Sequence, residues 1–242
     1  MADRNRRGRV IGIISAKGGV GKTAVALNLA LSLMLDFKKR VLAIDAHSIS
    51  PNLSLYLGII DVVPPGISYA LKDPSFARES VYIHSGTGLH LLAGSITSVK
   101  EMDLGNLKQV VENLRGEYDY IIIDTSPSLG ESLRNILRAC DEVLLVVNPW
   151  LPIVITNLKA VRIVEEMNKP LRIVLNKVGR GMGEMSVKEV EDSLGHRVIV
   201  TIPVDLEVYR GVEERKPVML ANPKSPGSVA IKKLANLLVS EE

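Results

Sequence analysis

The chain contains almost no residues that could form covalent or metal-based cross-links. Cys140 is the only cysteine among 242 residues. A single thiol cannot close an internal disulfide or supply a CxxC metal pair, so nothing points to an oxidising compartment. We interpret Cys140 as a small buried hydrophobe, because it adjoins Ala139 and the apolar run Val143–Val147.

Long apolar runs are also missing. The richest one, Val143–Ile155, is interrupted by Asn148, Pro149 and Pro152, and Val10–Ile14 is too short for the apolar core of a signal peptide. A membrane-spanning helix needs about 20 apolar residues. We therefore expect no integral membrane segment and a cytoplasmic location.

Neither sign of charge is in large excess. The chain has 30 basic and 27 acidic residues, which give a formal net charge of +3 and predict no obligate polyanionic partner. A local cluster of Arg4, Arg6, Arg7 and Arg9 could touch DNA or an anionic surface. The simpler interpretation, which we favour, is a flexible, solvated basic arm over residues 1–8.

The remaining composition, with 46% apolar and 24% charged residues, is typical of a globular protein with a large core. At roughly 150 residues per domain, the length allows one large domain or two small ones. No repeat, low-complexity tract or domain-boundary linker interrupts the sequence. We therefore predict a single domain over residues 1–242.

Short β-branched runs alternate along the chain with segments of helical spacing. Most runs are apolar at every position, which is typical of strands buried on both faces of a parallel sheet. The predicted strands are Val10–Ile14, Val41–Ile44, Leu89–Leu92, Tyr120–Asp124, Val143–Val147, Ile173–Leu175 and Val198–Ile202. The predicted helices are Lys22–Leu35, Leu107–Leu114, Ile153–Met167, Val187–Leu194 (with a capping box at Ser186) and Val229–Val239. This alternation indicates an α/β fold with a doubly wound, mostly parallel sheet and helices on both faces.

The most informative segment joins the first strand to the first helix. It reads Lys17-Gly18-Gly19-Val20-Gly21-Lys22-Thr23, in the strand–loop–helix context that a phosphate-binding loop requires. The glycines let backbone N–H groups turn inward around an anion, and the helix start adds partial positive charge. Lys22 would reach the β- and γ-phosphate oxygens, and the Thr23 hydroxyl would bind Mg²⁺. Lys17 would repel Lys22 unless an anion lay between them.

The segment KGGVGKT resembles the deviant P-loop of the MinD/ParA family of ATPases. Lys17 lies inside the loop, and Ala16 stands where the general P-loop pattern has glycine. The resemblance extends from about Arg9 to Val239 and is nearest to the MinD branch at Asn52–Gly58. It implies a P-loop NTPase fold and a homodimer when ATP is bound, in which Lys17 would reach the partner subunit's nucleotide.

The same resemblance implies further site residues. Asp124 ends an apolar strand, as in the second P-loop motif, and would hold a Mg²⁺-bound water, while Asp45 ends the strand that leads into switch I. Asn176 stands where relatives bond the adenine edge, and Pro203 and Asp205 lie in the segment that lines the other side of the base. The catalytic candidates are Lys17, Lys22, Asp45 and Asp124, and the metal candidates are Thr23 and Asp124. The nucleotide-binding candidates are Lys17, Gly18, Gly19, Val20, Gly21, Lys22, Thr23, Ala24, Asn176, Pro203 and Asp205.

Four positions depart from the family pattern. His47 stands where relatives usually have a second Asp near Mg²⁺ and the attacking water. Because a histidine with an ordinary pKa of about 6.5 is mostly neutral at pH 7, we expect poor positioning of that water and slow hydrolysis. Ala24 replaces a common hydroxyl residue, and the acidic end Glu241–Glu242 lacks a basic, membrane-targeting amphipathic helix. Trp150 replaces a frequent Glu and is either a core residue or a partner contact.

We therefore predict a MinD-like ATPase with ATP/ADP and Mg²⁺ as cofactors. It would act as an ATP-dependent dimerisation switch in spatial regulation, such as division-site placement, with charge stabilisation by Lys17, Lys22 and Mg²⁺. An unidentified regulatory or effector protein would be its partner and could bring it to a membrane or the nucleoid. Two alternatives stay open: a ParA-like ATPase that partitions DNA, a less favoured partner, and a nucleotide-binding module with little turnover.

Overall fold

The computed structural model describes residues 7–47, 52–59, 66–94 and 102–241. Most of the arm expected over residues 1–8 falls outside these ranges. The end of the arm is held in place: Gly8 is buried, its N–H donates to the Arg115 carbonyl (3.2 Å), and its carbonyl accepts from the Arg115 guanidinium (2.9 Å). Arg7 lies 3.4 Å from Glu112. The expected flexibility therefore does not extend to Gly8.

The described strands form one eight-stranded sheet in the order β3-β4-β2-β5-β1-β6-β7-β8. All neighbours are parallel except β3 and β4, which pair antiparallel at one edge, so the predicted doubly wound, mostly parallel sheet is confirmed. The strands are β1 (Arg9–Ile14), β2 (Val41–Ala46), β3 (Tyr82–Ile83), β4 (His90–Leu92), β5 (Tyr120–Thr125), β6 (Glu142–Val147), β7 (Leu171–Val178) and β8 (Val198–Pro203).

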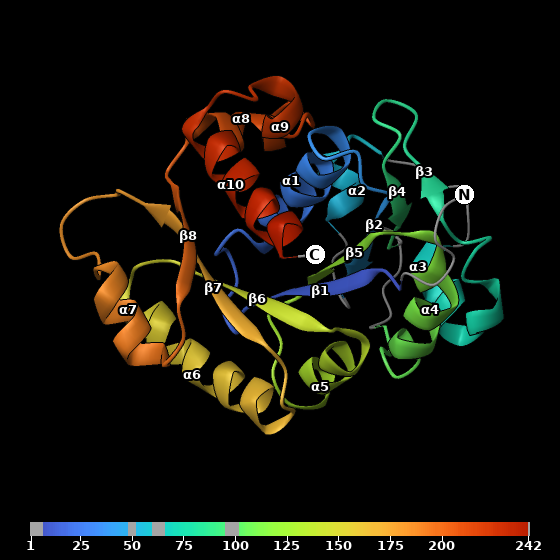
Figure 1. The fold of residues 1–242 in the computed structure, drawn as a ribbon, viewed down its shortest axis with the longest axis horizontal. Coiled ribbons are helices and arrows are strands. Elements are labelled where there is room, and N and C mark those ends of the chain that lie inside the picture. The colour runs from blue at the N-terminus through green and yellow to red at the C-terminus, as the bar shows by residue number, and fades with distance from the viewer. Residues whose placement is uncertain (1–6, 48–51, 60–65, 95–101, 242) are drawn as a thin grey trace.

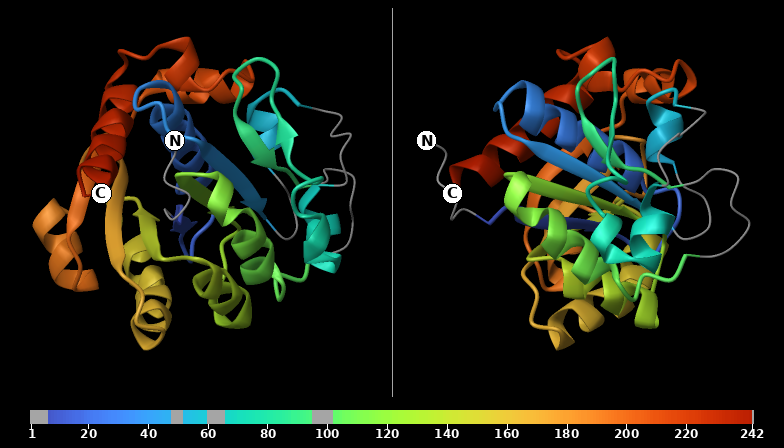
Figure 2. Two further views of the ribbon diagram at one scale, coloured as in Figure 1. Left: turned by 45° about the vertical axis from the view of Figure 1, so that its right-hand side comes forward. Right: turned by 90° about the vertical axis from the view of Figure 1, so that its right-hand side faces the viewer.

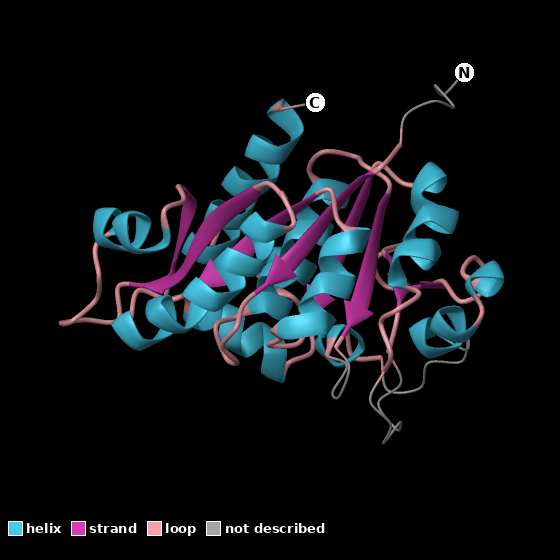
Figure 3. Cartoon of the chain, turned by 90° about the horizontal axis from the view of Figure 1, so that it is seen from below, coloured by secondary structure: helices cyan, strands magenta, loops and turns pink. Residues whose placement is uncertain are grey.

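Helices cover both faces of this sheet (Figures 1 and 3). One face packs against α1 (Lys22–Leu35), α2 (Leu53–Tyr56), α9 (Val218–Ala221) and α10 (Pro226–Ser240). The other face packs against α3 (Gly66–Lys72), α4 (Leu107–Leu114), α5 (Gly130–Ala139), α6 (Leu151–Glu166) and α7 (Val187–Leu194). The helix α8 (Leu206–Glu213) follows β8, and two 3₁₀ turns span Pro74–Phe76 and Arg115–Glu117. The antiparallel edge and α7 lie at opposite ends of the molecule (Figure 2).

Apolar residues at helical spacing predicted α1, α4 and α7 with their observed bounds. The predicted capping box is present, because the Ser186 hydroxyl accepts from the Glu189 N–H (3.2 Å) and the Glu189 carboxylate accepts from the Ser186 N–H (2.7 Å). Cys140 is 2% exposed, as expected. The helices α3, α5 and α8 were not predicted. In α5, Leu133, Ile136 and Leu137 lie at helical spacing and are buried, so that helix could have been found from the sequence. The short helices α3 and α8 depend on tertiary packing. None of the helices in the described ranges is long and apolar enough to cross a membrane.

The sheet register brings three strand ends together beside the glycine-rich loop. β2 and β5 pair so that Asp45 lies opposite Asp124, and Ile13 of β1 lies opposite Asp124 on the other side. The loop follows β1 directly, so it lies next to Asp124 on β5, with Asp45 one strand further along. Ligands of doubly wound sheets bind at this edge, outside the carboxyl ends of the strands.

Candidate functional site

The loop between β1 and α1 has a backbone that only glycine adopts readily. Gly19 and Gly21 have φ values of 76° and 101°. A Cβ on Gly21 would lie 2.3 Å from the Asn176 side-chain nitrogen, whereas a Cβ on Gly19 would meet nothing within 4 Å. Gly21 is therefore required both by its conformation and by the close approach of β7.

Three buried amides fix the loop to the neighbouring strands and to α6. The Val20 carbonyl accepts from the side-chain amides of Asn176 (2.8 Å) and Asn148 (3.2 Å). At the start of the loop, the Asn157 side-chain oxygen accepts from the Ala16 N–H (2.8 Å). These bonds hold the loop open without using its remaining N–H groups.

The second lysine of the loop is buried. Lys22 is 5% exposed, and burial lowers the pKa of its ammonium to about 8, with Asp124 offsetting this only in part. A buried cation of this kind is stabilised by an anion beside it. Thr23, which follows it at the start of α1, is also buried. Lys17 and Gly18 are exposed at the rim of the loop, outside the lining of the adjacent cavity.

A cluster of two carboxylates and an imidazole lies beside the loop. His47 Nδ1 is 3.3 Å from Asp124 Oδ2 and 3.6 Å from Asp45 Oδ1. Asp45 and Asp124 are register partners and point to the same side, and His47 lies just beyond the end of β2, within ion-pair distance of both. Asp45 also holds the start of α2, since its Oδ2 accepts from the N–H groups of Asn52 and Leu53, both at 2.8 Å.

The protonation of His47 differs from the expectation. Burial favours the neutral imidazole, but the contacts with Asp124 and Asp45 outweigh it and raise the pKa of His47 to about 9. The expectation of a mostly neutral histidine at pH 7 is therefore wrong for the ligand-free chain. Complete burial raises the pKa of Asp124 as well, although His47 opposes that effect. The sequence could not show this balance, because it depends on the register of β2 and β5.

A cavity of about 900 Å³ extends from the loop to α8 and α10. Of the nucleotide-binding candidates, Gly19, Gly21, Lys22, Thr23, Ala24, Asn176, Pro203 and Asp205 line it. Both oxygens of Asp205 are occupied, because they accept from the N–H groups of Glu207 (2.9 Å) and Gly227 (2.7 Å). Asp205 therefore shapes the cavity by capping α8 and holding the start of α10. Val20 is buried beneath the loop.

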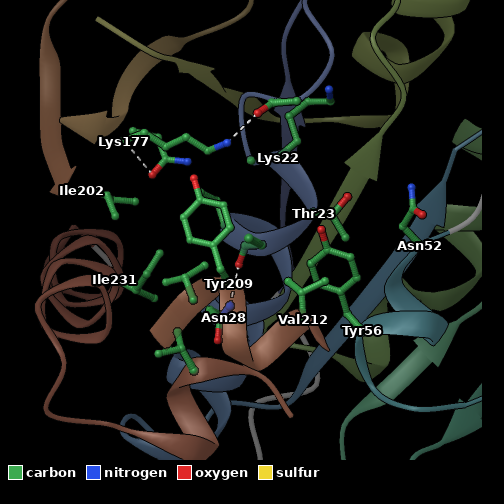
Figure 4. A pocket seen from close by; sticks show the side chains of 18 of the residues that line it. Lys22, Thr23, Asn28, Asn52, Tyr56, Lys177, Ile202, Tyr209, Val212 and Ile231 are labelled. Carbon is green, nitrogen blue, oxygen red and sulfur yellow. Dashed lines mark hydrogen bonds between the residues drawn. The ribbon is translucent and has the colours of Figure 1, made fainter. Parts of the chain in front are cut away.

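Three residues that the sequence analysis missed line the cavity (Figure 4). The Lys177 ammonium donates to the Gly19 carbonyl (2.8 Å) and lies 5.6 Å from the centre of the Tyr209 ring, whose hydroxyl accepts from Arg180 (2.6 Å). Tyr56 enters from α2 beside Thr23. Lys177 could have been found, since it follows Asn176 at a strand end. Tyr209 lies on α8, which no pattern predicted.

Trp150 is neither a full core residue nor a free surface contact. It is half-buried just before α6, and a Cβ on Gly183 would lie 3.6 Å from its ring. Leu151 and Ile155, which follow it on α6, are 56% and 49% exposed. The indole therefore packs partly on the glycine-rich loop that follows β7.

The residues present fit a nucleotide with a divalent cation beside it. Asp124 is fully buried, and among the described residues neither of its oxygens has a hydrogen-bond partner, as expected of a carboxylate that faces a cation. The glycine cradle and the buried Lys22 offer donors to phosphate oxygens. The adjoining cavity has the volume of a small-molecule site.

A doubly wound sheet with a lysine-containing glycine loop between β1 and α1 defines a P-loop nucleotide-binding protein. The chain matches the family model described as an AAA domain over residues 8–171. It is 33% identical over 232 residues to an uncharacterized ATP-binding protein of Methanocaldococcus jannaschii, which covers 95% of this chain and 87% of that protein.

Solved structures agree with this class. The fold is similar to the septum site-determining protein MinD complexed with Mg-ADP from Pyrococcus horikoshii, with a TM-score of 0.88, 28% identity and 96% of both chains covered. It is also similar to a chain of the MinC:MinD cell division protein complex of Aquifex aeolicus, with a TM-score of 0.86, 26% identity and 97% of both chains covered. The chain belongs to the MinD/ParA family of P-loop ATPases.

Proposed function

We propose that this chain is a MinD-like ATPase in which ATP binding switches a monomer to a homodimer. The observation that carries the proposal is a phosphate loop with one buried lysine, Lys22, and one exposed lysine, Lys17. Similarity to MinD chains, one with Mg-ADP and one from a complex with MinC, supports it. The switch would serve spatial regulation, such as division-site placement, through an effector protein.

Each residue would have a distinct part in binding. The inward N–H groups of the loop and the Lys22 ammonium would neutralise the β- and γ-phosphate oxygens. Thr23 and Asp124 would hold Mg²⁺, which supplies positive charge next to the transferred phosphoryl group. Asn176 and Pro203 would lie against the base, while Lys17 would extend from the rim towards the partner's nucleotide.

Hydrolysis would be slow in the isolated chain. Asp45 is occupied with the start of α2, and His47 contacts Asp124 instead of offering a carboxylate to an attacking water. The same observation favours a second candidate function, a nucleotide-binding module with little turnover. The two candidate functions predict different outcomes, because only the dimerisation switch gives different oligomeric states with ATP and with ADP.

Three lysine variants test the proposal. Binding of a fluorescent ATP analogue and gel filtration with ADP or a non-hydrolysable analogue are measured for the parent, Lys22→Ala, Lys17→Ala and the control Lys188→Ala. Lys188 is an exposed residue of α7 outside the cavity. Loss of the Lys22 charge should weaken binding by roughly tenfold or more, because charge-assisted hydrogen bonds contribute about 1.5–3 kcal/mol each. Lys17→Ala should bind normally but stay monomeric.

Equal affinities of the parent and Lys22→Ala would show that the loop does not bind the triphosphate. A Lys17→Ala dimer as stable as that of the parent would remove the role of Lys17 across the interface. If the parent gives the same elution volume with ADP and the ATP analogue, the dimerisation switch is wrong and the low-turnover binding module is favoured.

A further inference from the structure

The cluster of Asp45, His47 and Asp124 has the composition of a metal site with one nitrogen ligand. Each side chain offers one ligand atom, and these atoms all lie within 4.8 Å of one another. Both carboxylates are 0% exposed and the imidazole is 9% exposed. The two aspartates are held in place by the pairing of β2 with β5.

The atoms that face the centre of the cluster make ion-pair contacts with one another but no hydrogen bonds. Among the described residues, no hydrogen-bond partner is present for either carboxylate oxygen of Asp124 or for Nδ1 of His47. The 3.3 Å contact between them therefore has the distance of an ion pair without the alignment of a hydrogen bond. Asp45 uses its Oδ2 on backbone N–H groups, and its Oδ1 receives only the His47 N–H at 3.2 Å. Buried polar atoms of this kind require a partner.

The donor set is not the one that Mg²⁺ prefers. Mg²⁺ takes oxygen ligands in a strict octahedron and keeps several waters. An imidazole nitrogen beside carboxylates shifts preference towards later divalent metals, such as Co²⁺ and Zn²⁺. A carboxylate at position 47 would have kept the set all-oxygen.

We propose that Asp45, His47 and Asp124 bind a divalent transition-metal ion, with His47 Nδ1 as a ligand, beside the phosphate loop. This deepens the proposed function by naming the ion of the same site, but the ion can bind without a nucleotide. An imidazole coordinates only as its neutral form, so binding releases the His47 proton to solvent and the ion takes its place between the carboxylates. The chain therefore has a higher affinity for Co²⁺ than for Mg²⁺ at this site.

The test is a titration of the untagged, nucleotide-free chain with Co²⁺, followed by its visible absorption, with Mg²⁺ as a competitor. The variants are His47→Asn, His47→Asp and Asp124→Asn. His196→Asn is the matched control, because His196 pairs with Glu165 (3.0 Å) on the surface, away from the cluster. Circular dichroism of each variant verifies folding.

We expect one Co²⁺ per chain in the parent and in His196→Asn, with a spectrum typical of a nitrogen ligand. His47→Asn and Asp124→Asn should each weaken Co²⁺ binding by roughly tenfold or more, since even partners of metal ligands contribute about 10–100-fold. His47→Asp should fold, lose the nitrogen signature and lower the ratio of Co²⁺ to Mg²⁺ affinity.

An unchanged Co²⁺ affinity and spectrum in His47→Asn would overturn the proposal, as would a His47→Asp variant with the parent's selectivity. A parent that binds no Co²⁺ would show that His47 and the carboxylates form a permanent ion pair instead. Binding of the fluorescent ATP analogue is measured separately. A parent chain that binds Co²⁺ but not the ATP analogue would refute the proposed function and would leave the proposed metal site valid.

Discussion

The two glycines of the phosphate loop give a matched test of its geometry. Gly21→Ala and Gly19→Ala both place a Cβ at a positive φ, which costs about 1–2 kcal/mol. Both also restrict the unfolded chain to a similar extent, about 0.4–1 kcal/mol, so that effect cancels between them. They differ in surroundings, because only the Cβ at position 21 would lie 2.3 Å from the Asn176 amide nitrogen.

The difference in stability can be worked from this contact. In Gly21→Ala the Asn176 side chain must move, and its buried hydrogen bond to the Val20 carbonyl (2.8 Å) is lost. Losing a buried hydrogen bond costs about 1–3 kcal/mol. We therefore expect the free energy of unfolding of Gly21→Ala to be about 1–3 kcal/mol lower than that of Gly19→Ala. We also expect Gly21→Ala to bind the ATP analogue more weakly.

Equilibrium urea unfolding of the parent and both variants measures this difference. A double variant, Gly21→Ala with Asn176→Ala, supplies the control, because without the amide the extra cost at position 21 should disappear. Equal destabilisation by Gly19→Ala and Gly21→Ala would refute the reasoning, because the clash with Asn176 on β7 would then have no effect on stability.

Three further predictions concern other parts of the molecule. Tyr209→Ala should weaken binding of the ATP analogue several-fold, because Tyr209 lines the cavity. Tyr209→Phe should bind as the parent does, because the hydroxyl already accepts from Arg180; equal binding by Tyr209→Ala would contradict this. Burial raises the pKa of Glu241, but Arg9 and Arg172 outweigh it and lower that pKa below its unfolded value. Glu241 therefore stabilises the fold above its unfolded pKa of about 4.3, and the effect is lost as pH falls through the lowered folded value. In urea unfolding, Glu241→Gln should be slightly less stable than the parent at pH 7, by less than about 1 kcal/mol, since the pair is half-exposed, and equally stable at strongly acidic pH. His47→Asp should raise the steady-state Mg²⁺-ATPase rate, because general-base help is worth about 10²–10⁴-fold; a parent as fast as the variant would contradict this.

The sequence alone determined the class of fold and the phosphate loop. Apolar runs without alternation are satisfied by strands covered on both faces, and the spacing of α4 and α7 left one buried stripe on each helix. The loop was equally visible, because wrapping an anion with backbone N–H groups requires glycines at fixed places. Such signals are local, so they need no knowledge of distant residues.

Only the tertiary structure decided the electrostatics of the site and the walls of its cavity. The raised pKa of His47 depends on Asp124, which is 77 positions away by number and lies opposite Asp45 only through the register of β2 and β5. Asp205 was expected to line the base, and it does line the cavity, but its carboxylate is bound to two backbone N–H groups. Tyr209 reaches the cavity from a short helix that packing places. These features arise from contacts between segments that no local pattern relates.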